Sequence, residues 1–139
     1  MAQEVLVKES ITTEMIAGGK ELTRRLDETT LDVTASLWFY FVDNQRWDLI
    51  LGIHQILEEG PLKSINIIRN TLSKHPIEGV DFSDVLPIQS DHSLIRRLKA
   101  VITTGKTIQD IRISQTVVEN VFIQDAYIYR LMWKPEYRK

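Results

Sequence analysis

The chain has 139 residues, of which 43% are hydrophobic and 26% charged, and its formal net charge is −2. This composition is typical of a soluble globular domain and gives no overall attraction to nucleic acid. The absence of cysteine excludes disulfides, thiolate zinc sites and cysteine nucleophiles, and no apolar run approaches the ~20 residues of a membrane span. Because the N-terminus has no basic-then-apolar signal pattern, we expect a cytoplasmic protein.

We expect residues 1–139 to form one domain, with a loose arm at 1–10 and a polar tail at 134–139. The spacing of apolar residues predicts a first helix over 12–28. Gly18 and Gly19 lie on or beside its apolar stripe. They indicate either close packing on a sheet or a backbone that approaches a ligand, but the strand-then-glycine order of phosphate loops is absent.

Residues 33–54 are predicted to form a β-hairpin, because both arms are rich in β-branched and aromatic residues. The turn residues lie at 43–45. A three-residue loop pairs Phe41 with Trp47 and makes one face wholly apolar, whereas a two-residue loop sets Phe41 against Arg46 and mixes both faces. We therefore predict the three-residue loop, with the apolar face packed against helices.

Glycine and proline residues mark the ends of the predicted elements in the middle of the chain. Gly60-Pro61 predicts the start of a second helix, and His75-Pro76 predicts its end. A short strand is expected at 84–88, and Pro87 favours an edge position because proline cannot donate to a β-ladder.

A third helix is predicted between Asp91 as its N-cap and Gly105 just beyond its C-terminus. Its apolar face is expected to carry Leu94, Ile95, Leu98, Val101 and Ile102. Its basic residues, Arg96, Arg97 and Lys99, are expected to lie off that face.

Residues 108–133 are predicted to form a second hairpin, with Glu119-Asn120 as its tight turn and Val118 opposite Val121. One face is expected to carry Ile111, Ile113, Val117, Phe122, Ala126 and Ile128. The other is expected to carry Arg112, Ser114, Thr116, Ile123, Asp125, Tyr127 and Tyr129.

The predicted order is α-β-β-α-(β)-α-β-β. Strands joined by hairpins and separated by helices indicate an α+β fold. We expect two layers, with helices packed on one face of a largely antiparallel sheet of about four to five strands.

Several segments together resemble a family of uncharacterised bacterial proteins. The segments are Ala35–Tyr40 (ASLWFY), Trp47–Ile50 (WDLI), Gly60-Pro61 and Asp125–Leu131 (DAYIYRL). In that family a tryptophan-containing hairpin precedes a Gly-Pro helix start and a terminal Asp-Ala-Tyr-Ile-Tyr-Arg-Leu strand. The resemblance spans roughly residues 15–131 and supports the fold, but it implies no activity.

The polar face of the last hairpin is the best candidate site. Arg112, Asp125, Tyr127 and Tyr129 are expected to converge there, with Arg130 on the opposite face. An Arg–Asp pair beside tyrosine hydroxyls suits a small anion or carboxylate. The same residues also suit a cross-strand ion pair or a subunit interface, where aromatic residues and arginine are enriched.

A second candidate contact surface is the mixed face of the first hairpin, with Trp38 and Tyr40. The leading hypothesis is a non-catalytic binding or assembly domain without a cofactor or metal. It would associate with itself or with a protein partner, not with nucleic acid or membrane.

Two alternatives stay open. Scattered carboxylates suggest a small metal-dependent nuclease, and they are Asp43, Asp48, Glu58, Glu59, Asp81 and Asp84. A small-ligand carrier would instead hold an enclosed pocket between helices and sheet. The three histidines, His54, His75 and His92, show no metal-ligand spacing, and no Gly-x-Ser-x-Gly motif occurs.

Overall fold

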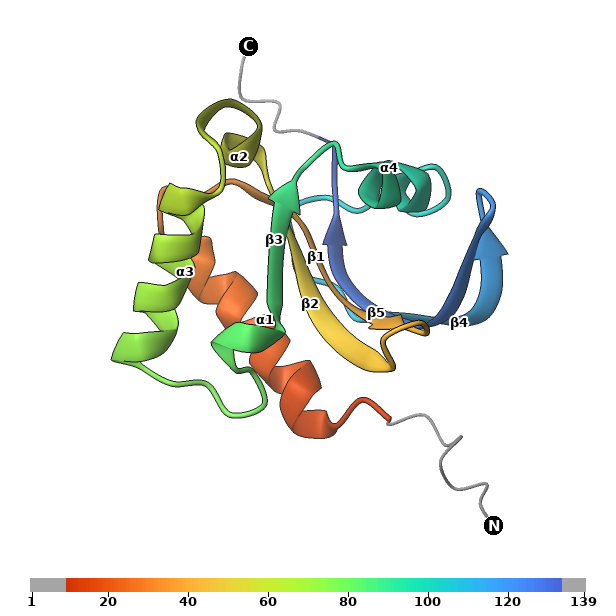
Figure 1. Cartoon of the computed structure of the whole chain (residues 1–139), viewed down its shortest axis with the longest axis horizontal. Coiled ribbons are helices and arrows are strands. Elements are labelled where there is room, and N and C mark those ends of the chain that lie inside the picture. Colours follow the sequence, from red (N-terminus) through yellow and green to blue (C-terminus); the bar gives the residue numbers. More distant parts are fainter. Residues whose placement is uncertain (1–9, 134–139) are drawn as a thin grey trace.

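The computed structural model describes residues 10–133, whose strands form one five-stranded sheet (Figure 1). The expected tail at 134–139, and all of the expected arm except Ser10, lie outside the described residues. The elements are α1 (Thr13–Leu26), β1 (Val33–Phe41), β2 (Arg46–Ile53), α2 (His54–Glu59), α3 (Leu62–Lys74), the 3-10 turn η2 (Phe82–Asp84), β3 (Val85–Gln89), α4 (Ser93–Lys99), β4 (Ile111–Val118) and β5 (Val121–Leu131).

The strand order in the sheet is β3-β2-β1-β5-β4. Strands β2 and β3 run parallel, and the other neighbouring strands run antiparallel. The predicted α+β class and the largely antiparallel sheet are therefore confirmed. The short helix α2, which follows β2 directly, was not predicted.

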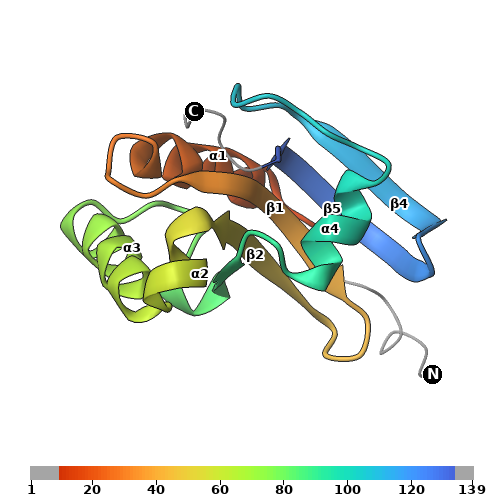
Figure 2. The same ribbon diagram turned by 90° about the horizontal axis from the view of Figure 1, so that it is seen from above.

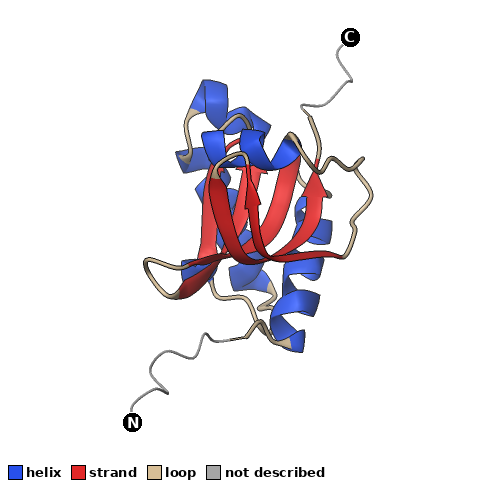
Figure 3. Cartoon of the chain, turned by 90° about the vertical axis from the view of Figure 1, so that its right-hand side faces the viewer, coloured by secondary structure: helices blue, strands red, loops and turns tan. Residues whose placement is uncertain are grey.

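The helices cover both faces of the sheet, and not one face as expected; Figure 3 shows helices in front of the strands and behind them. Helices α1 and α3 pack on one face through residues such as Leu22 and Ile68. Helix α4 packs on the other face through Ile95 and Leu98, inside the curve formed by β1, β5 and β4 (Figure 1). The expectation failed because a sheet whose strands carry apolar residues on both sides can bury both.

The predicted three-residue loop of the first hairpin is wrong. Phe41 lies opposite Arg46 and Tyr40 opposite Trp47, which is the register of the rejected two-residue loop, although the strands end before Val42 and resume after Gln45. Phe41 faces α4 whereas Trp47 faces α1 and α3, so the apolar face of the prediction is split between two cores. Hydrophobicity misled the prediction because Arg46 and Asp48, which lie opposite Phe41 and Phe39, reach solvent near the turn. Away from the turn, a slip of one residue leaves both buried faces apolar.

The turn of the last hairpin is confirmed, but its strands bend where no bend was predicted. Glu119 and Asn120 both have positive φ, as a two-residue type I′ turn requires. Gln115 also has positive φ, at 49°. Beyond that residue the side chains lie on the opposite faces from those predicted. Val117 and Phe122 point away from α4, and Ile123 points into the core beneath α4.

A second irregularity, in β5, corrects the expected position of Arg130. Ser36 pairs with Arg130 but Leu37 pairs with Ile128, so Tyr129 is an extra residue in β5. Tyr129 and Arg130 consequently both face α1, where Arg130 binds Asp27 at 2.8 and 2.9 Å. The prediction that Arg130 emerges on the face opposite Tyr129 is wrong.

Helix α1 is confirmed, and its glycines serve close packing. Thr12 caps its N-terminus by accepting a hydrogen bond from the Met15 amide. A Cβ on Gly19 would lie 2.6 Å from both Trp38 Nε1 and Tyr129 Oη, so the helix approaches the sheet where a side chain has no room.

Helix α4 is shorter than predicted. His92 is its N-cap instead of Asp91, and the helix ends at Lys99 instead of near Gly105. Val101 is consequently exposed, whereas Lys99, expected off the apolar face, is only 4% exposed.

Candidate functional site

The polar cluster on the α1-facing side of the last hairpin begins with a two-point ion pair. Arg112 donates from Nε to Asp125 Oδ1 at 2.6 Å and from Nη2 to Oδ2 at 2.7 Å. Asp125 is buried, while 46% of the Arg112 side chain is exposed. The carboxylate, by its hydrogen bonds, raises the pKa of Arg112 and fixes the direction of its guanidinium.

A second group of contacts lies beside this pair. The Tyr127 hydroxyl donates to Asp110 Oδ1 at 2.9 Å, and Lys20 Nζ donates to Asp110 Oδ2 at 2.8 Å. The hydrogen bond from Lys20 lowers the pKa of Asp110. Burial, followed by the bond to Asp110, raises the pKa of Tyr127, so this phenol stays protonated at neutral pH. The group links α1 to the segment before β4.

The other three predicted site residues belong to the core. Tyr129 is fully buried and donates from its hydroxyl to Ile16 O at 2.5 Å. Trp38 donates from Nε1 to Met15 O at 2.9 Å, and Tyr40 packs edge-on against Trp47 at 5.4 Å between ring centroids. Burial raises the pKa of Tyr129 above the usual value of 10 for a tyrosine. Trp38 and Tyr129 therefore hold α1 on the sheet.

The sequence hypothesis thus grouped four hairpin residues that do share one side of the sheet, but it did not identify which are accessible. Arg112 and Tyr127 reach the surface, and Tyr129 is covered by α1. It also missed the exposed pair Val117 and Phe122, which lie opposite each other in β4 and β5 and are 65% and 53% exposed. The bend at Gln115 turns them outward, and no residue pattern marks that bend.

The two edges of the sheet differ. Strand β3 has five residues and contains Pro87, as predicted for an edge. Strand β4 has eight residues, contains no proline and has β5 as its one neighbour in the sheet. Figure 2 shows β4 at the outer margin of the sheet. In an antiparallel ladder the backbone groups of every second residue point away from the neighbour, so β4 offers donors and acceptors at this margin.

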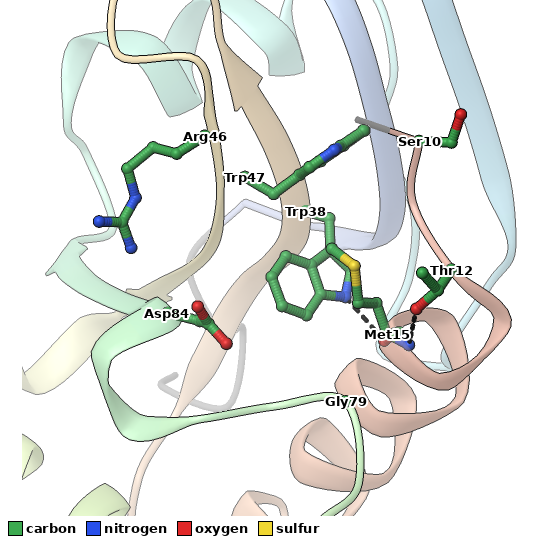
Figure 4. A pocket seen from close by; sticks show the side chains of 8 residues that line it. All are labelled: Ser10, Thr12, Met15, Trp38, Arg46, Trp47, Gly79 and Asp84. Atoms are coloured by element: carbon green, nitrogen blue, oxygen red, sulfur yellow. Dashed lines mark hydrogen bonds between the residues drawn. The ribbon is translucent and has the colours of Figure 1, made fainter. Parts of the chain in front are cut away.

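An open cleft lies on the α1-facing side of the first hairpin, near its turn. Its volume is about 470 Å³, and Figure 4 shows its lining residues, which are Ser10, Thr12, Met15, Trp38, Arg46, Trp47, Gly79 and Asp84. The cleft is open to solvent, unlike the enclosed pocket that the carrier hypothesis predicts.

The described residues give no support to the nuclease alternative. Between Ser10 and Trp133, no three histidine, aspartate or glutamate side chains come close enough to hold a metal ion. Asp81 and Asp84 instead cap η2 reciprocally, and the His92 ring accepts the Leu94 amide at the start of α4. Within the same part of the chain, no helix is long and apolar enough to cross a bilayer.

Comparisons with known proteins add no information about this chain. Family models, curated proteins and solved structures were each searched with this chain, and none of the three searches produced a match.

Proposed function

We propose that this protein is a non-catalytic binding domain that associates with a second copy of itself through its last hairpin. The observation that carries the proposal is the outward-facing pair Val117 and Phe122, which is 65% and 53% exposed at the sheet margin. An exposed aromatic beside a β-branched residue leaves apolar area in water, and removing that area from water stabilises a complex.

The open edge of β4 supports the same surface. Natural sheets blunt their edges with short strands, prolines, charges or bends. Strand β3 has a proline and few residues, whereas β4 has only the bend at Gln115 and Arg112, whose charge is paired with Asp125. That bend divides the edge into two short stretches, 111–114 and 116–118. Side-chain contacts by Val117 and Phe122 would therefore supply most of the interface, and backbone pairing less.

The polar residues beside the apolar pair suit the rim of such an interface. The Arg112 guanidinium is fixed by Asp125 before any partner arrives, so little side-chain entropy is lost when it makes a contact. Tyr127 presents a ring held in place by Asp110 and by Tyr129, whose centroid is 5.6 Å away. Arginine and tyrosine are among the residues enriched at protein interfaces.

We further propose that the protein acts in the cytoplasm, because a cysteine-free chain suits a reducing compartment. We propose neither a cofactor nor a nucleic-acid partner.

Solution mass measured by light scattering tests the proposal with a matched pair of variants. In Val117→Lys/Phe122→Lys two charges replace the apolar pair. The control, Val42→Lys/Leu62→Lys, adds the same charge at residues that are 50% and 69% exposed elsewhere. Substitutions at such exposed positions change stability by about 0.5 kcal/mol or less, so both variants should fold.

We expect the wild type and the control to have twice the 16.1 kDa mass of the chain, and the hairpin variant to be monomeric. Equal masses for all three proteins would contradict the proposed surface. A monomeric wild type would contradict self-association and would leave a different protein as the partner to be sought.

A further inference from the structure

We infer that the open cleft beside the first hairpin binds a small zwitterion with an apolar group, of the kind represented by a free apolar amino acid. This inference is independent of the proposed self-association, because the cleft and the last hairpin share no lining residue.

Three segments that are distant in sequence build the cleft. They are the start of α1, the turn end of the β1–β2 hairpin and the segment from Gly79 to Asp84. Gly79 has a φ of 91°, and a Cβ there would lie 2.2 Å from Glu14 O, so its backbone lies against α1. The wall formed by this contact is rigid, because packed backbone leaves no side chain to rearrange. At about 470 Å³ the cleft falls within the ~300–1,000 Å³ usual for small-molecule sites.

The cation at the rim is held in a fixed position. Arg46 donates from Nε to Asp48 Oδ1 at 2.8 Å and from Nη2 to Ser83 O at 3.1 Å. Nearly half of the side chain, 48%, remains exposed. A guanidinium has five N–H groups in a planar fork, so these two bonds orient the side chain and leave donors for a carboxylate.

An anion lines the same cleft. Asp84 accepts the Asp81 amide on Oδ2 at 2.9 Å, which fixes its carboxylate. Within the described chain, Oδ1 has no hydrogen-bond donor. This oxygen is available to an ammonium group. Arg46 is itself paired with Asp48, whose side chain is 17% exposed, so the rim carries one cation and two anions. A ligand of a single charge sign meets at least one like charge there.

The floor is apolar. Met15 is half-buried and lies in front of the Trp38 indole, with Trp47 beside them (Figure 4). The Trp38 indole N–H already donates to Met15 O. At Trp38 and Met15 the floor therefore presents only carbon and sulfur atoms to the ligand. A methionine thioether adapts its shape to different apolar groups. The ligand therefore carries its two charges toward the rim and its apolar group toward Met15.

Titration calorimetry with free L-leucine tests the inference, and Trp133→Phe protein provides a second readout. Trp133 lies on the other side of the sheet near Lys99, so its removal leaves the fluorescence of Trp38 and Trp47 as the signal. Two analogues serve as chemical controls. N-acetyl-L-leucine lacks the ammonium group, and L-leucinamide lacks the carboxylate.

We expect saturable leucine binding that weakens at least tenfold in Arg46→Gln and in Asp84→Asn. The matched controls, Arg97→Gln and Asp43→Asn, change exposed residues outside the cleft and should bind as the wild type does. L-leucinamide should bind Arg46→Gln at least as tightly as wild type, because it has no carboxylate to lose a partner and no longer meets the like charge of Arg46. N-acetyl-L-leucine should likewise bind Asp84→Asn at least as tightly as wild type.

Absence of saturable binding by leucine would overturn the inference. Binding that neither Arg46→Gln nor Asp84→Asn weakens would also overturn it, because the ligand would then lie elsewhere. Both analogues are also measured on unaltered protein. Binding there as tight as that of leucine would overturn the inference, even if a variant is poorly folded.

Discussion

Replacing Gly19 with alanine tests how closely α1 packs on the sheet. In an exposed helix this change would stabilise the protein, because alanine favours helix over glycine by about 1 kcal/mol. At Gly19 we expect the opposite sign. The new Cβ would lie 2.6 Å from Trp38 Nε1, 2.6 Å from Tyr129 Oη and 2.8 Å from Tyr129 Cε2.

The magnitude follows from what must move. Forcing an extra methyl group into a packed core costs about 1–3 kcal/mol. The two side chains that it displaces hold hydrogen bonds to Met15 O and Ile16 O, and each such bond contributes about 1 kcal/mol. If both bonds are lost, subtracting the ~1 kcal/mol gain in helix propensity leaves a net loss of about 2–4 kcal/mol.

Urea unfolding followed by circular dichroism and tryptophan fluorescence measures this loss. Ala17→Gly, on the exposed side of the same helix, should cost about 1 kcal/mol by propensity alone. Gly105→Ala should cost nothing, since no atom lies within 4 Å of its Cβ position. If Gly19→Ala were as stable as the wild type, the close approach of α1 to Trp38 and Tyr129 would be refuted.

Three further predictions concern stability. Asp27→Asn should cost about 2–3 kcal/mol in urea unfolding, because it leaves the buried Arg130 charge without its carboxylate; an unchanged midpoint would contradict a stabilising role for this pair. Glu119→Asn/Asn120→Gly should raise the free energy of unfolding by about 0.5–1 kcal/mol, because both turn residues have positive φ; a lower melting temperature would count against the type I′ turn. Burial lowers the pKa of Lys99 below its usual 10.5, so folding is penalised while this amine must be charged. Lys99→Met should therefore be more stable than wild type at pH 7, and the difference should shrink as the pH rises toward 10.5, whereas a constant difference would argue against a titrating lysine.

The sequence predicted the parts of the fold that local chemistry determines. Gly60-Pro61 precedes α3, Pro87 lies in an edge strand, and Glu119-Asn120 forms the last turn, each for a reason confined to a few residues. The register of the first hairpin could not be predicted in this way. Away from its turn both faces of that hairpin are buried and apolar in either register, and near the turn Arg46 and Asp48 reach solvent, so hydrophobicity favoured the wrong register.

The site depended on two backbone irregularities that leave no clear sequence signal. The bend at Gln115 exposes Val117 and Phe122, and the extra residue Tyr129 turns Arg130 toward α1. A glutamine with positive φ is uncommon, and the residues on either side of Gln115 do not predict this conformation. The prediction assumed that successive side chains alternate strictly between the two faces of a strand. It was therefore correct near Arg112 and wrong beyond the bend.

The central claim is that the last hairpin joins two copies of the chain. The most direct test is the solution mass of the unaltered protein, measured by light scattering over a dilution series. The account predicts twice the 16.1 kDa mass of the chain at high concentration, falling toward the mass of a single chain on dilution. A mass of one chain at every concentration would contradict it.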